Sequence, residues 1–380
     1  KKSISNFKDI YQIIKKNKID IVIVGPEQPL VDGLVDYLSK KKIRVFGPSK
    51  FASQLEGSKA FMKNLCKKNK IPTANFGIFD DYNKASNFIK KGKFPIVVKA
   101  DGLASGKGVS ICTSEKEALK KTKKILDGEF KSSNKVVLEE FLEGEELSYF
   151  LIVDEKSCCF FGSAQDHKKV GEGDTGPNTG GMGAYSPSHL LTKVLEKKIK
   201  KKIIEPTIKA MKNLGHAFKG ILYAGLMIKK GEPYLIEYNI RMGDPECQVL
   251  MMRLKTDLLK IIDYSTRNKL NKLKIEWSDK NCITIVLCAN GYPFKYIKNS
   301  QIKNLFNVPA DKNLQIFHSG TYLKNKKIYS NGGRVLNVTV LGKSLRKARK
   351  ISLNNIRKIN WTDGFYREDI GWKAINNKKI

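Results

Sequence analysis

The pattern of apolar and polar positions begins with alternating helix-like and strand-like segments. Apolar residues at helical spacing predict a helix over 7–18, and a continuous apolar run predicts a buried strand at 19–24. A second helix is predicted over about 30–41, and a second strand follows at 43–46. Strand, helix and strand joined by short turns indicate a βαβ unit with a parallel sheet, which binds ligands at the carboxyl ends of its strands.

The pattern becomes richer in strands after residue 57. Ser58 is a predicted N-cap for a helix that continues to about residue 69, and Pro72 is predicted to end this helix. Later strands are predicted at 75–79, 96–99, 108–112, 136–140, 146–165, 220–241, 283–288 and 335–341, and later helices at 115–126, 189–214 and 344–357. This succession predicts an α/β protein with more than one domain.

Length and composition narrow the class of protein. A chain of 380 residues with 41% hydrophobic residues is long enough for two to four packed units. It contains no apolar run of the ~18 residues that a membrane span needs, and no signal peptide opens it, so a cytoplasmic protein without a membrane partner is predicted. Its seven cysteines include no C-x-x-C pair, which favours reduced thiols over a disulfide framework or a zinc site.

The formal net charge of +34 raises the question of nucleic-acid binding. Proteins that bind nucleic acid concentrate basic residues on one face and interleave exposed aromatic residues. The lysines of this chain are spread over nearly every predicted helix and turn. The charge is therefore interpreted as a property of a solvated surface, with no nucleic-acid partner, although RNA binding keeps this single point of support.

A glycine-rich loop follows the predicted strand that ends in Lys99. Its candidate nucleotide-binding residues are Gly102, Ser105, Gly106, Lys107 and Gly108. Glycine tolerates the positive φ angles that turn backbone N–H groups towards a polyphosphate. The spacing does not match a Walker-A loop, and Gly108 stands where that motif has its hydroxyl residue. The pattern fits a strand-borne lysine that meets phosphates beneath a glycine-rich lid; the alternative is a flexible hairpin with a solvated lysine.

An acidic cluster, Glu139 to Glu146, lies at the end of the predicted strand at 136–140. A carboxylate or backbone carbonyl there can accept a hydrogen bond from an adenine amino group, and a backbone N–H beside Leu142 can donate one to the ring. A later carboxylate can reach a ribose hydroxyl. The candidate nucleotide-binding residues are Glu139, Glu140, Phe141, Leu142 and Glu146; the alternative is an acidic turn in a basic protein.

The segment 235–241 carries the strongest chemical pattern. Because side chains alternate along a strand, Glu237, Asn239 and Arg241 are predicted to share one face, opposite Ile236, Tyr238 and Ile240. A carboxylate and an amide oxygen are hard ligands suited to a Mg²⁺ ion that also binds ATP phosphates. Arg241 can neutralise charge that develops on a transferred phosphoryl group. A catalytic and metal-binding face is therefore predicted, since such groups are costly to bury without a purpose.

Two further loops are predicted to bind substrate. The first contains Asp166, His167 and Lys168 and follows a predicted strand. The second, at 171–183, is too rich in glycine to form a core, so it is either disordered or wraps an anion with its backbone amides. Its candidate residues are Pro177, Asn178, Thr179, Gly180, Gly181, Met182 and Gly183.

Taken together, these motifs resemble the phosphoribosylamine–glycine ligases, also called glycinamide ribonucleotide synthetases, which are ATP-grasp enzymes of purine biosynthesis. The resemblance covers nearly the whole chain, and the string from Asp174 to Pro187 is its most specific part. Its other motifs are Ile23–Glu27, Leu55–Lys59, 99–109, Glu139–Glu146, Gln165–Lys168, Tyr223–Met227, Glu237–Glu246 and Asp369–Trp372.

The resemblance implies an α/β fold with an ATP-grasp core and a mobile lid. The implied domains are an incomplete doubly wound α/β domain at 1–57, the ATP-grasp domain at 58–272 with its lid at about 75–142, and a small α/β domain at 273–380. It also implies ligation of glycine to 5-phosphoribosylamine, with ATP giving ADP and phosphate through glycyl phosphate. The implied cofactor is Mg²⁺ or Mn²⁺, and we expect a monomer.

The resemblance also assigns roles to individual residues. Lys59 and Lys99 correspond to the two lysines that face the phosphates, and Glu237 and Asn239 correspond to the metal ligands. Glu140 and Leu142 correspond to the adenine hinge, and Glu146 is placed for the ribose. Asp166, His167 and the loop 176–183 line the acceptor side, where Asp244 helps to position substrate; Arg241, Lys99, Asp166 and His167 are the catalytic candidates.

The sequence departs from the family at its start. Family members open with a strand and a Gly-Asn-Gly-Gly-Arg-Glu-His-type loop. This strand, its loop, a helix and a second strand, roughly the first 45 residues of such a βαβ unit, are missing from the sequence. We expect this chain to be a fragment, because its other motifs are intact; the alternative is an inactive ligase with a damaged acceptor site. A bicarbonate-using carboxylase of the ATP-grasp type is the alternative activity.

Overall fold

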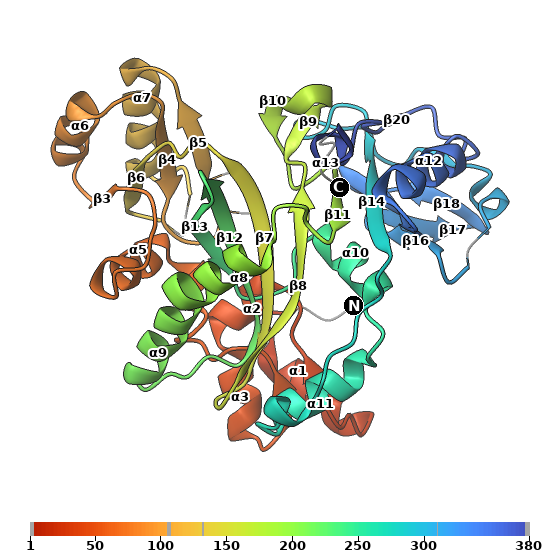
Figure 1. The fold of residues 1–380 in the computed structure, drawn as a ribbon, viewed down its shortest axis with the longest axis horizontal. Coiled ribbons are helices and arrows are strands. Elements are labelled where there is room, and N and C mark those ends of the chain that lie inside the picture. Colours follow the sequence, from red (N-terminus) through yellow and green to blue (C-terminus); the bar gives the residue numbers. More distant parts are fainter. Residues whose placement is uncertain (1–3, 105–107, 131–132, 310, 377–380) are drawn as a thin grey trace. The chain divides into compact units, whose positions relative to one another are not determined.

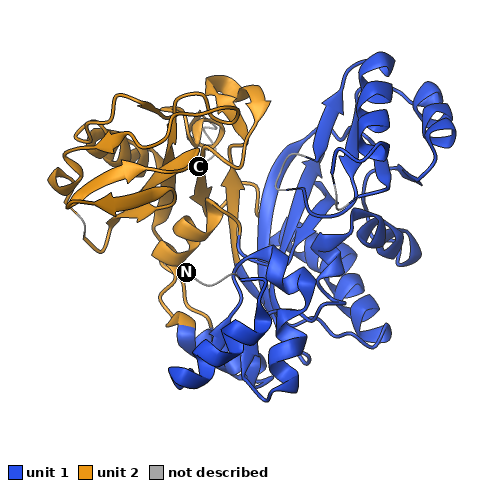
Figure 2. Cartoon of the chain, turned by 180° about the vertical axis from the view of Figure 1, so that it is seen from behind, with its two compact units in different colours: residues 1–161, 192–242, 259–274 blue, residues 162–191, 243–258, 275–380 orange. Residues whose placement is uncertain are grey.

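The computed structural model describes residues 4–104, 108–130, 133–309 and 311–376. The chain divides into two compact units (Figure 2). Unit 1 comprises residues 1–161, 192–242 and 259–274, and unit 2 comprises residues 162–191, 243–258 and 275–380. Each unit is built from three separate stretches of chain, so residues far apart in the sequence meet within both.

Unit 1 begins with a small parallel sheet in which β1 (Val22–Ile23) pairs with β2 (Val45–Phe46), as predicted. The surrounding helices are α1 (Phe7–Lys16), α2 (Glu27–Asp32), α3 (Leu34–Lys40) and α4 (Gln54–Gly57). The predicted single helix over 30–41 is wrong, because Gly33 adopts a left-handed conformation (φ 95°) that ends α2. The buried strand at 19–24 is also wrong in part, since Ile23 is 51% exposed.

The predicted lid segment is a four-stranded antiparallel sheet with the strand order β3-β6-β4-β5. Its strands are β3 (Phe76–Phe79), β4 (Ile96–Ala100), β5 (Val109–Cys112) and β6 (Val136–Glu140). Helices α6 (Tyr82–Lys91) and α7 (Glu115–Leu126) pack on it (Figure 1) through Ala85, Ile89, Ala118 and Ile125. Helix α7 and strand β6 have the predicted bounds, whereas α6 was not predicted.

The remainder of unit 1 contains long antiparallel strands. Strand β12 (Gly220–Lys229) lies between β7 (Glu145–Val153) and β13 (Glu232–Asn239). The predicted long helix is found as α8 (Lys193–Ile199), the π-helical segment η2 (Lys200–Ile204) and α9 (Glu205–Asn213). Helix α5 (Lys59–Lys68), helix α11 (Leu258–Thr266) and the short helix η3 (Leu270–Lys272) complete it.

Unit 2 is built on an antiparallel sheet that begins with the end of β8 (Cys158–Asp166). From β8 the strand order continues with β11 (Gly183–Ser186), β14 (Asn281–Ala289), β19 (Arg334–Gly342) and β16 (Leu314–His318), each paired with the one before it. Strand β20 (Gly364–Phe365) also pairs with β14. Helices α10 (Glu246–Arg253), α12 (Leu345–Ile356) and α13 (Trp372–Asn376) belong to this unit. Ile283, Ile285, Leu336 and Val338 lie in its buried core.

Several short elements of unit 2 were not predicted. A small sheet has the order β15-β18-β17, with β15 (Gln301–Ile302), β17 (Thr321–Lys324) and β18 (Lys327–Ser330), and η4 (Leu305–Asn307) lies nearby in the sequence. The glycine-rich segment contains β9 (Lys169–Gly171), η1 (Glu172–Asp174) and β10 (Thr175–Asn178), and β9 and β10 pair antiparallel. Its described residues therefore form an ordered hairpin.

The α/β class predicted from the sequence is confirmed, and the seven cysteines are free thiols. None of the described helices combines the length and apolar character needed to cross a membrane. The bounds of the three predicted domains remain predictions.

Candidate active site

In unit 1, the start of α5 and the end of β4 bring two predicted phosphate-binding lysines together. Ser58 caps α5, since its Oγ accepts a hydrogen bond from the Phe61 N–H at 3.0 Å. The Asp101 carboxylate accepts from the Ser58 hydroxyl at 3.1 Å and from the Ala60 N–H at 3.1 Å, which fixes the loop after β4 to this helix end. The Lys59 ammonium donates to the Gly102 carbonyl at 3.0 Å.

The electrostatics of Lys59 show which charges lie around it. Burial lowers its pKa, Glu237 and Asp101 oppose this effect, and the positive charge of Lys99 adds to it. A second cation and a carboxylate, each from another element, therefore act on the charge of Lys59. This arrangement suits a ligand that carries several negative charges, such as a nucleotide polyphosphate with its metal ion.

The glycine-rich loop is closed by the paired ends of β4 and β5, where the Ala100 N–H donates to the Gly108 carbonyl at 2.7 Å. Gly102 has a φ of 87°, which glycine adopts without strain. A Cβ atom at Gly108 would lie 2.6 Å from the Cβ of Ala104, so the loop needs glycine there. The predicted residues Ser105, Gly106 and Lys107 lie outside the described part of the chain.

The predicted adenine hinge follows β6. Leu142 is buried, and the Glu140 carboxylate accepts hydrogen bonds from the Asn75 backbone N–H at 3.0 Å and from its side-chain amide at 3.1 Å. Glu146 lies on β7, opposite Met227 of β12. Phe141, which lies between Glu140 and Leu142 in the sequence, is half-buried. The roles of Glu140, Phe141, Leu142 and Glu146 towards adenine and ribose remain predictions.

Glu139 points into the protein and pairs with two lysines. Its carboxylate lies 2.9 Å from the Lys99 ammonium and 3.0 Å from that of Lys63, and all three side chains are almost completely buried. Its predicted contact with adenine remains untested. Sequence reasoning missed Lys63, which is one lysine among many in a predicted helix; its position on the buried face of α5 was the only available signal.

The face of β13 carries the predicted metal ligands. Tyr238 and Ile240 are buried, while Glu237, Asn239 and Arg241 are half-buried, so these five residues alternate as predicted. The register shifts where Gly225 pairs with Glu237 and Leu226 pairs with Leu235, which leaves Ile236 as an extra residue. The prediction that Ile236 shares the buried face of Tyr238 and Ile240 is therefore wrong: the alternation changes phase at this extra residue, so that Leu235 is buried and Ile236 is half-buried.

The donor set on β13 fits a divalent cation. Glu237 supplies a carboxylate and Asn239 an amide oxygen, both hard ligands for Mg²⁺ or Mn²⁺. In the described part of the chain, no three His, Cys, Asp or Glu side chains gather as a metal-binding cluster. A metal here would therefore complete its coordination with phosphate oxygens and water, as Mg²⁺ does in nucleotide sites.

Arg241 is engaged by two carboxylates of unit 1. Its Nε lies 2.8 Å from Glu27, and an Nη atom lies 3.0 Å from Glu56. The Glu56 carboxylate also accepts from the Ile240 N–H at 2.9 Å. Burial raises the pKa of Glu56 to about 7, although Arg241 opposes that rise. The predicted role of Arg241 towards a transferred phosphoryl group remains a prediction.

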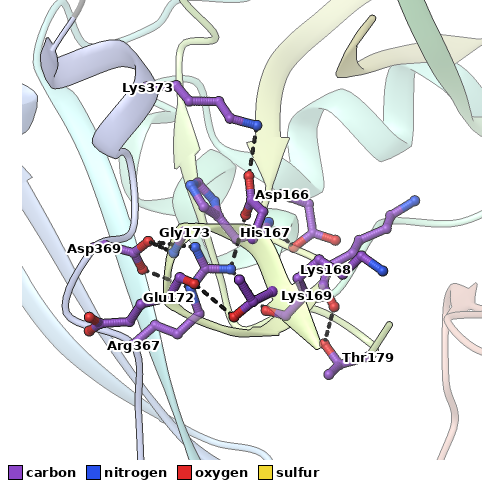
Figure 3. Close-up of polar contacts among 12 residues, drawn as sticks. Asp166, His167, Lys168, Lys169, Glu172, Gly173, Thr179, Arg367, Asp369 and Lys373 are labelled. Carbon is purple, nitrogen blue, oxygen red and sulfur yellow. Dashed lines mark hydrogen bonds and ion pairs between the residues drawn. The ribbon is translucent and has the colours of Figure 1, made fainter. Parts of the chain in front are cut away.

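In unit 2, the loop after β8 and the glycine-rich segment hold each other in place (Figure 3). The Thr179 N–H and hydroxyl donate to the Lys168 carbonyl at 2.7 and 2.8 Å, and the Met182 N–H donates to the His167 carbonyl at 2.8 Å. A Cβ atom at Gly181 would lie 2.6 Å from an oxygen of Asp166, so this close approach requires glycine. The predicted acceptor-side residues Asp166, His167, Lys168 and 178–183 are thus neighbours.

Arg334, which the sequence analysis did not select, connects two predicted substrate-binding positions. Its Nη atoms donate to the Gly180 carbonyl at 2.6 Å and to the Asp244 carboxylate at 2.8 Å. The Tyr292 hydroxyl accepts from the Gly180 N–H at 2.9 Å. The middle of the loop is therefore fixed to Asp244 through a guanidinium from β19, and Pro177 and Asn178 lie in the adjoining exposed strand β10.

His167 is buried beside a network of charges from the C-terminal segment. Its Nε2 accepts a hydrogen bond from the Gly371 N–H at 2.9 Å, so the neutral ring carries its proton on Nδ1. That Nδ1 has no hydrogen-bond partner among the residues that the structure describes. Burial, together with the nearby Arg367 charge, lowers the pKa of His167 to about 4. His167 is therefore neutral near pH 7.

The titration of His167 gives a test of this environment. Because its pKa is lower in the folded chain than in the unfolded chain, the unfolded state binds more protons as the pH falls below about 6.5. We expect the free energy of unfolding to fall between pH 6.5 and about 4, by roughly 3 kcal/mol from this group. Urea titrations should show a shallower fall in His167→Gln, while the exposed His318→Gln should match wild type; an unchanged slope in His167→Gln would contradict the assignment.

The fold and the lysine–carboxylate arrangement define the class: solved ATP-grasp structures have this architecture. A biotin carboxylase from Campylobacter jejuni has a TM-score of 0.74 over 98% of this chain and 82% of its own, and its 18% identity shows the fold alone. A phosphoribosylamine–glycine ligase from Thermotoga maritima has a TM-score of 0.79 at 35% identity, over 86% of this chain and 81% of its own.

The sequence comparisons identify the family. Family models for phosphoribosylglycinamide synthetase match the N domain at residues 1–56, the ATP-grasp (A) domain at 57–247 and the C domain at 282–373. The phosphoribosylamine–glycine ligase of Brucella melitensis is 48% identical, over 96% of this chain and 86% of the relative. The chloroplastic enzyme of Arabidopsis thaliana is 48% identical, over 99% and 72%. This chain belongs to the phosphoribosylglycinamide synthetase family.

Proposed function

We propose that this chain ligates glycine to 5-phosphoribosylamine and forms glycinamide ribonucleotide, ADP and phosphate, a step of purine biosynthesis. The observation that carries the proposal is that Lys99 and Glu237 both act on the charge of Lys59, in a chain of this family. Two cations and a metal-binding carboxylate meet the needs of phosphoryl transfer from ATP. The relatives named above carry the name of this enzyme.

In the first half of the reaction, a carboxylate oxygen of glycine attacks the γ-phosphorus of ATP, and the bond to the β-phosphate oxygen breaks. The products are glycyl phosphate and ADP. Lys59 and Lys99 stabilise the negative charge on the phosphate oxygens, and Arg241 neutralises the acyl phosphate. Glu237 and Asn239 would hold the Mg²⁺ or Mn²⁺ ion, which polarises the phosphoryl oxygens.

In the second half, the amine of 5-phosphoribosylamine attacks the carbonyl carbon of glycyl phosphate. The new C–N bond replaces the C–O bond to phosphate, which leaves with the glycine oxygen, and the nitrogen loses one proton. We assign the acceptor to Asp166, Lys168, Asp244 and the 177–183 loop of unit 2, with Asp166 as the proton acceptor. His167, neutral near pH 7, acts there as a hydrogen-bonding group and not as a cation.

Two further properties are proposed from the sequence. The chain acts as a monomer, which light scattering after size-exclusion chromatography would test. It works in the cytoplasm, an assignment supported by seven cysteines that are all free thiols.

The choice of acid tests the proposal against the carboxylase alternative. ADP release should require glycine when ATP, 5-phosphoribosylamine and Mg²⁺ are present, and mass spectrometry should detect glycinamide ribonucleotide. Bicarbonate in place of glycine should give no release above background. Turnover that bicarbonate supports and glycine does not would assign this chain to the carboxylases.

A further inference from the structure

Lys63 is a lysine of unit 1 with no exposed surface. A buried ammonium is unfavourable unless its hydrogen bonds are satisfied, so its partners show what it is for. Its Nζ donates to the Thr73 hydroxyl at 2.7 Å and lies 3.0 Å from a Glu139 carboxylate oxygen. The same Nζ lies 5.4 Å from the centre of the Phe76 ring, at cation–π distance. A hydroxyl, a carboxylate and an aromatic ring therefore support this ammonium, against the burial and the Lys99 charge that lower the pKa of Lys63.

The Glu139 carboxylate connects Lys63 to Lys99, the lysine assigned to the ATP phosphates. The Glu139 carboxylate uses one oxygen for Lys63 and the other for Lys99, at 3.0 and 2.9 Å. Without Lys63, the whole charge of Glu139 would fall on Lys99, in surroundings that screen charge poorly. Sharing the carboxylate therefore leaves Lys99 with net positive charge to offer a phosphate, while still fixing the position of its ammonium.

The Thr73 hydroxyl connects Lys63 to β13, the strand that carries the predicted metal ligands. The Thr73 hydroxyl that accepts from Lys63 donates in turn to the Leu235 carbonyl at 2.6 Å. The Leu235 N–H donates to the Pro72 carbonyl at 2.8 Å. Both backbone groups of Leu235, its N–H and its carbonyl, are therefore bonded to the segment before β3. Leu235 lies two residues before Glu237, next to the bulge that sets the phase of the metal-binding face.

We propose that Lys63 is a positioning residue of the nucleotide site, which places Lys99 through Glu139 and the Glu237 strand through Thr73. This inference rests on the proposed function, since it deepens the assignment of Lys99 to the phosphates and of Glu237 to the metal. Lys63 acts through its neighbours and does not touch the nucleotide. Its effect is specific to ATP and its metal, and glycine binding does not depend on it.

The test uses the full chain with Lys63→Met, which keeps the length of the side chain and removes its charge. Residues that orient a ligand-binding group typically change affinity or activity by ~10–100-fold, and we expect kcat/KM for ATP to fall within that range. The KM for ATP and the concentration of Mg²⁺ giving half-maximal rate should rise, while the KM for glycine at saturating ATP stays unchanged. Lys67→Met, one turn further along α5 and exposed, is the matched control and should match wild type.

A double variant separates positioning from a merely structural role. In Lys63→Met/Glu139→Gln no unshared carboxylate neutralises Lys99, so kcat/KM for ATP should recover in part relative to Lys63→Met, although Lys99 has lost the partner that fixes its position. A structural role predicts the opposite, because removing two buried groups should be at least as harmful as removing one. Should Lys63→Met not fold, Thr73→Val removes the hydroxyl that joins Lys63 to the Leu235 carbonyl, keeps the pairing of Lys63 with Glu139, and should raise the Mg²⁺ requirement.

Each result decides the matter. Equal effects on ATP and glycine, a double variant no better than the single one, or an unchanged Mg²⁺ requirement in Thr73→Val would overturn the role of Lys63. A wild-type chain that makes no glycinamide ribonucleotide would instead overturn the proposed function, so the two failures are distinguishable.

Discussion

Replacing Glu237 by alanine is expected to abolish ATP-dependent ligation. The Glu237 carboxylate is one of the two protein groups that would hold the metal, and it also acts on the charge of Lys59. Metal ions contribute several kcal/mol to phosphoryl transfer, so at ~1.4 kcal/mol per factor of ten the loss should be about 10³-fold or more in kcat/KM. Steady-state ADP release over a range of ATP and Mg²⁺ concentrations measures it.

Glu232→Ala is the matched control for this variant. Glu232 lies at the other end of β13, where its carboxylate pairs with Lys198 at 2.6 Å and Lys202 at 2.7 Å on the surface. Removing these partly exposed ion pairs should change turnover little. If Glu237→Ala retained wild-type turnover at every Mg²⁺ concentration, the metal would have to be held by other residues.

Replacing Arg367 by methionine should have the largest effect on stability. Its guanidinium is 1% exposed and binds the Asp369 carboxylate at 2.7 and 2.8 Å, Asp174 at 3.1 Å and the Lys169 carbonyl at 2.9 Å (Figure 3). Breaking a buried ion pair on one side typically costs ~3–5 kcal/mol, because the partner charges stay buried. Urea unfolding measures this loss.

The same variant should impair the acceptor side. Asp369 accepts from the Gly173 N–H at 2.8 Å, and Gly371 donates to His167, so the C-terminal segment anchors both the glycine-rich hairpin and the histidine. We expect the KM for 5-phosphoribosylamine to rise while the KM for ATP is kept. Arg357→Met, which breaks an exposed pair with Glu368 at 3.4 Å, should cost less than ~1 kcal/mol. Equal stability losses in the two variants would contradict this account of Arg367.

Local signals in the sequence predicted much of the candidate nucleotide-binding site in unit 1. The cap at Ser58, the bounds of α7 and β6, and the alternation of Glu237, Asn239 and Arg241 depend on residues within a few positions of one another. Such patterns follow from backbone geometry and can be read from one sequence. The short helix break at Gly33 was missed because glycine within a helical pattern is often tolerated.

The charged groups that hold the site together could not be predicted in this way. Lys63 meets Leu235 only through Thr73, and Arg334 reaches Gly180 from 154 residues away. Arg367 is separated from Lys169 by 198 residues. Nothing in local spacing distinguishes these residues from the many solvated lysines and arginines of a chain with charge +34. Their roles come from long-range packing within each unit.

The central claim is that glycine is activated as glycyl phosphate and captured by 5-phosphoribosylamine. Its most direct test supplies glycine labelled with ¹⁸O in both carboxylate oxygens, together with ATP, Mg²⁺ and 5-phosphoribosylamine, and analyses the products by mass spectrometry. We expect one ¹⁸O atom in the released phosphate and one in the amide carbonyl of glycinamide ribonucleotide, with one ADP formed for each product. Unlabelled phosphate, or ADP formed without the labelled amide, would contradict it.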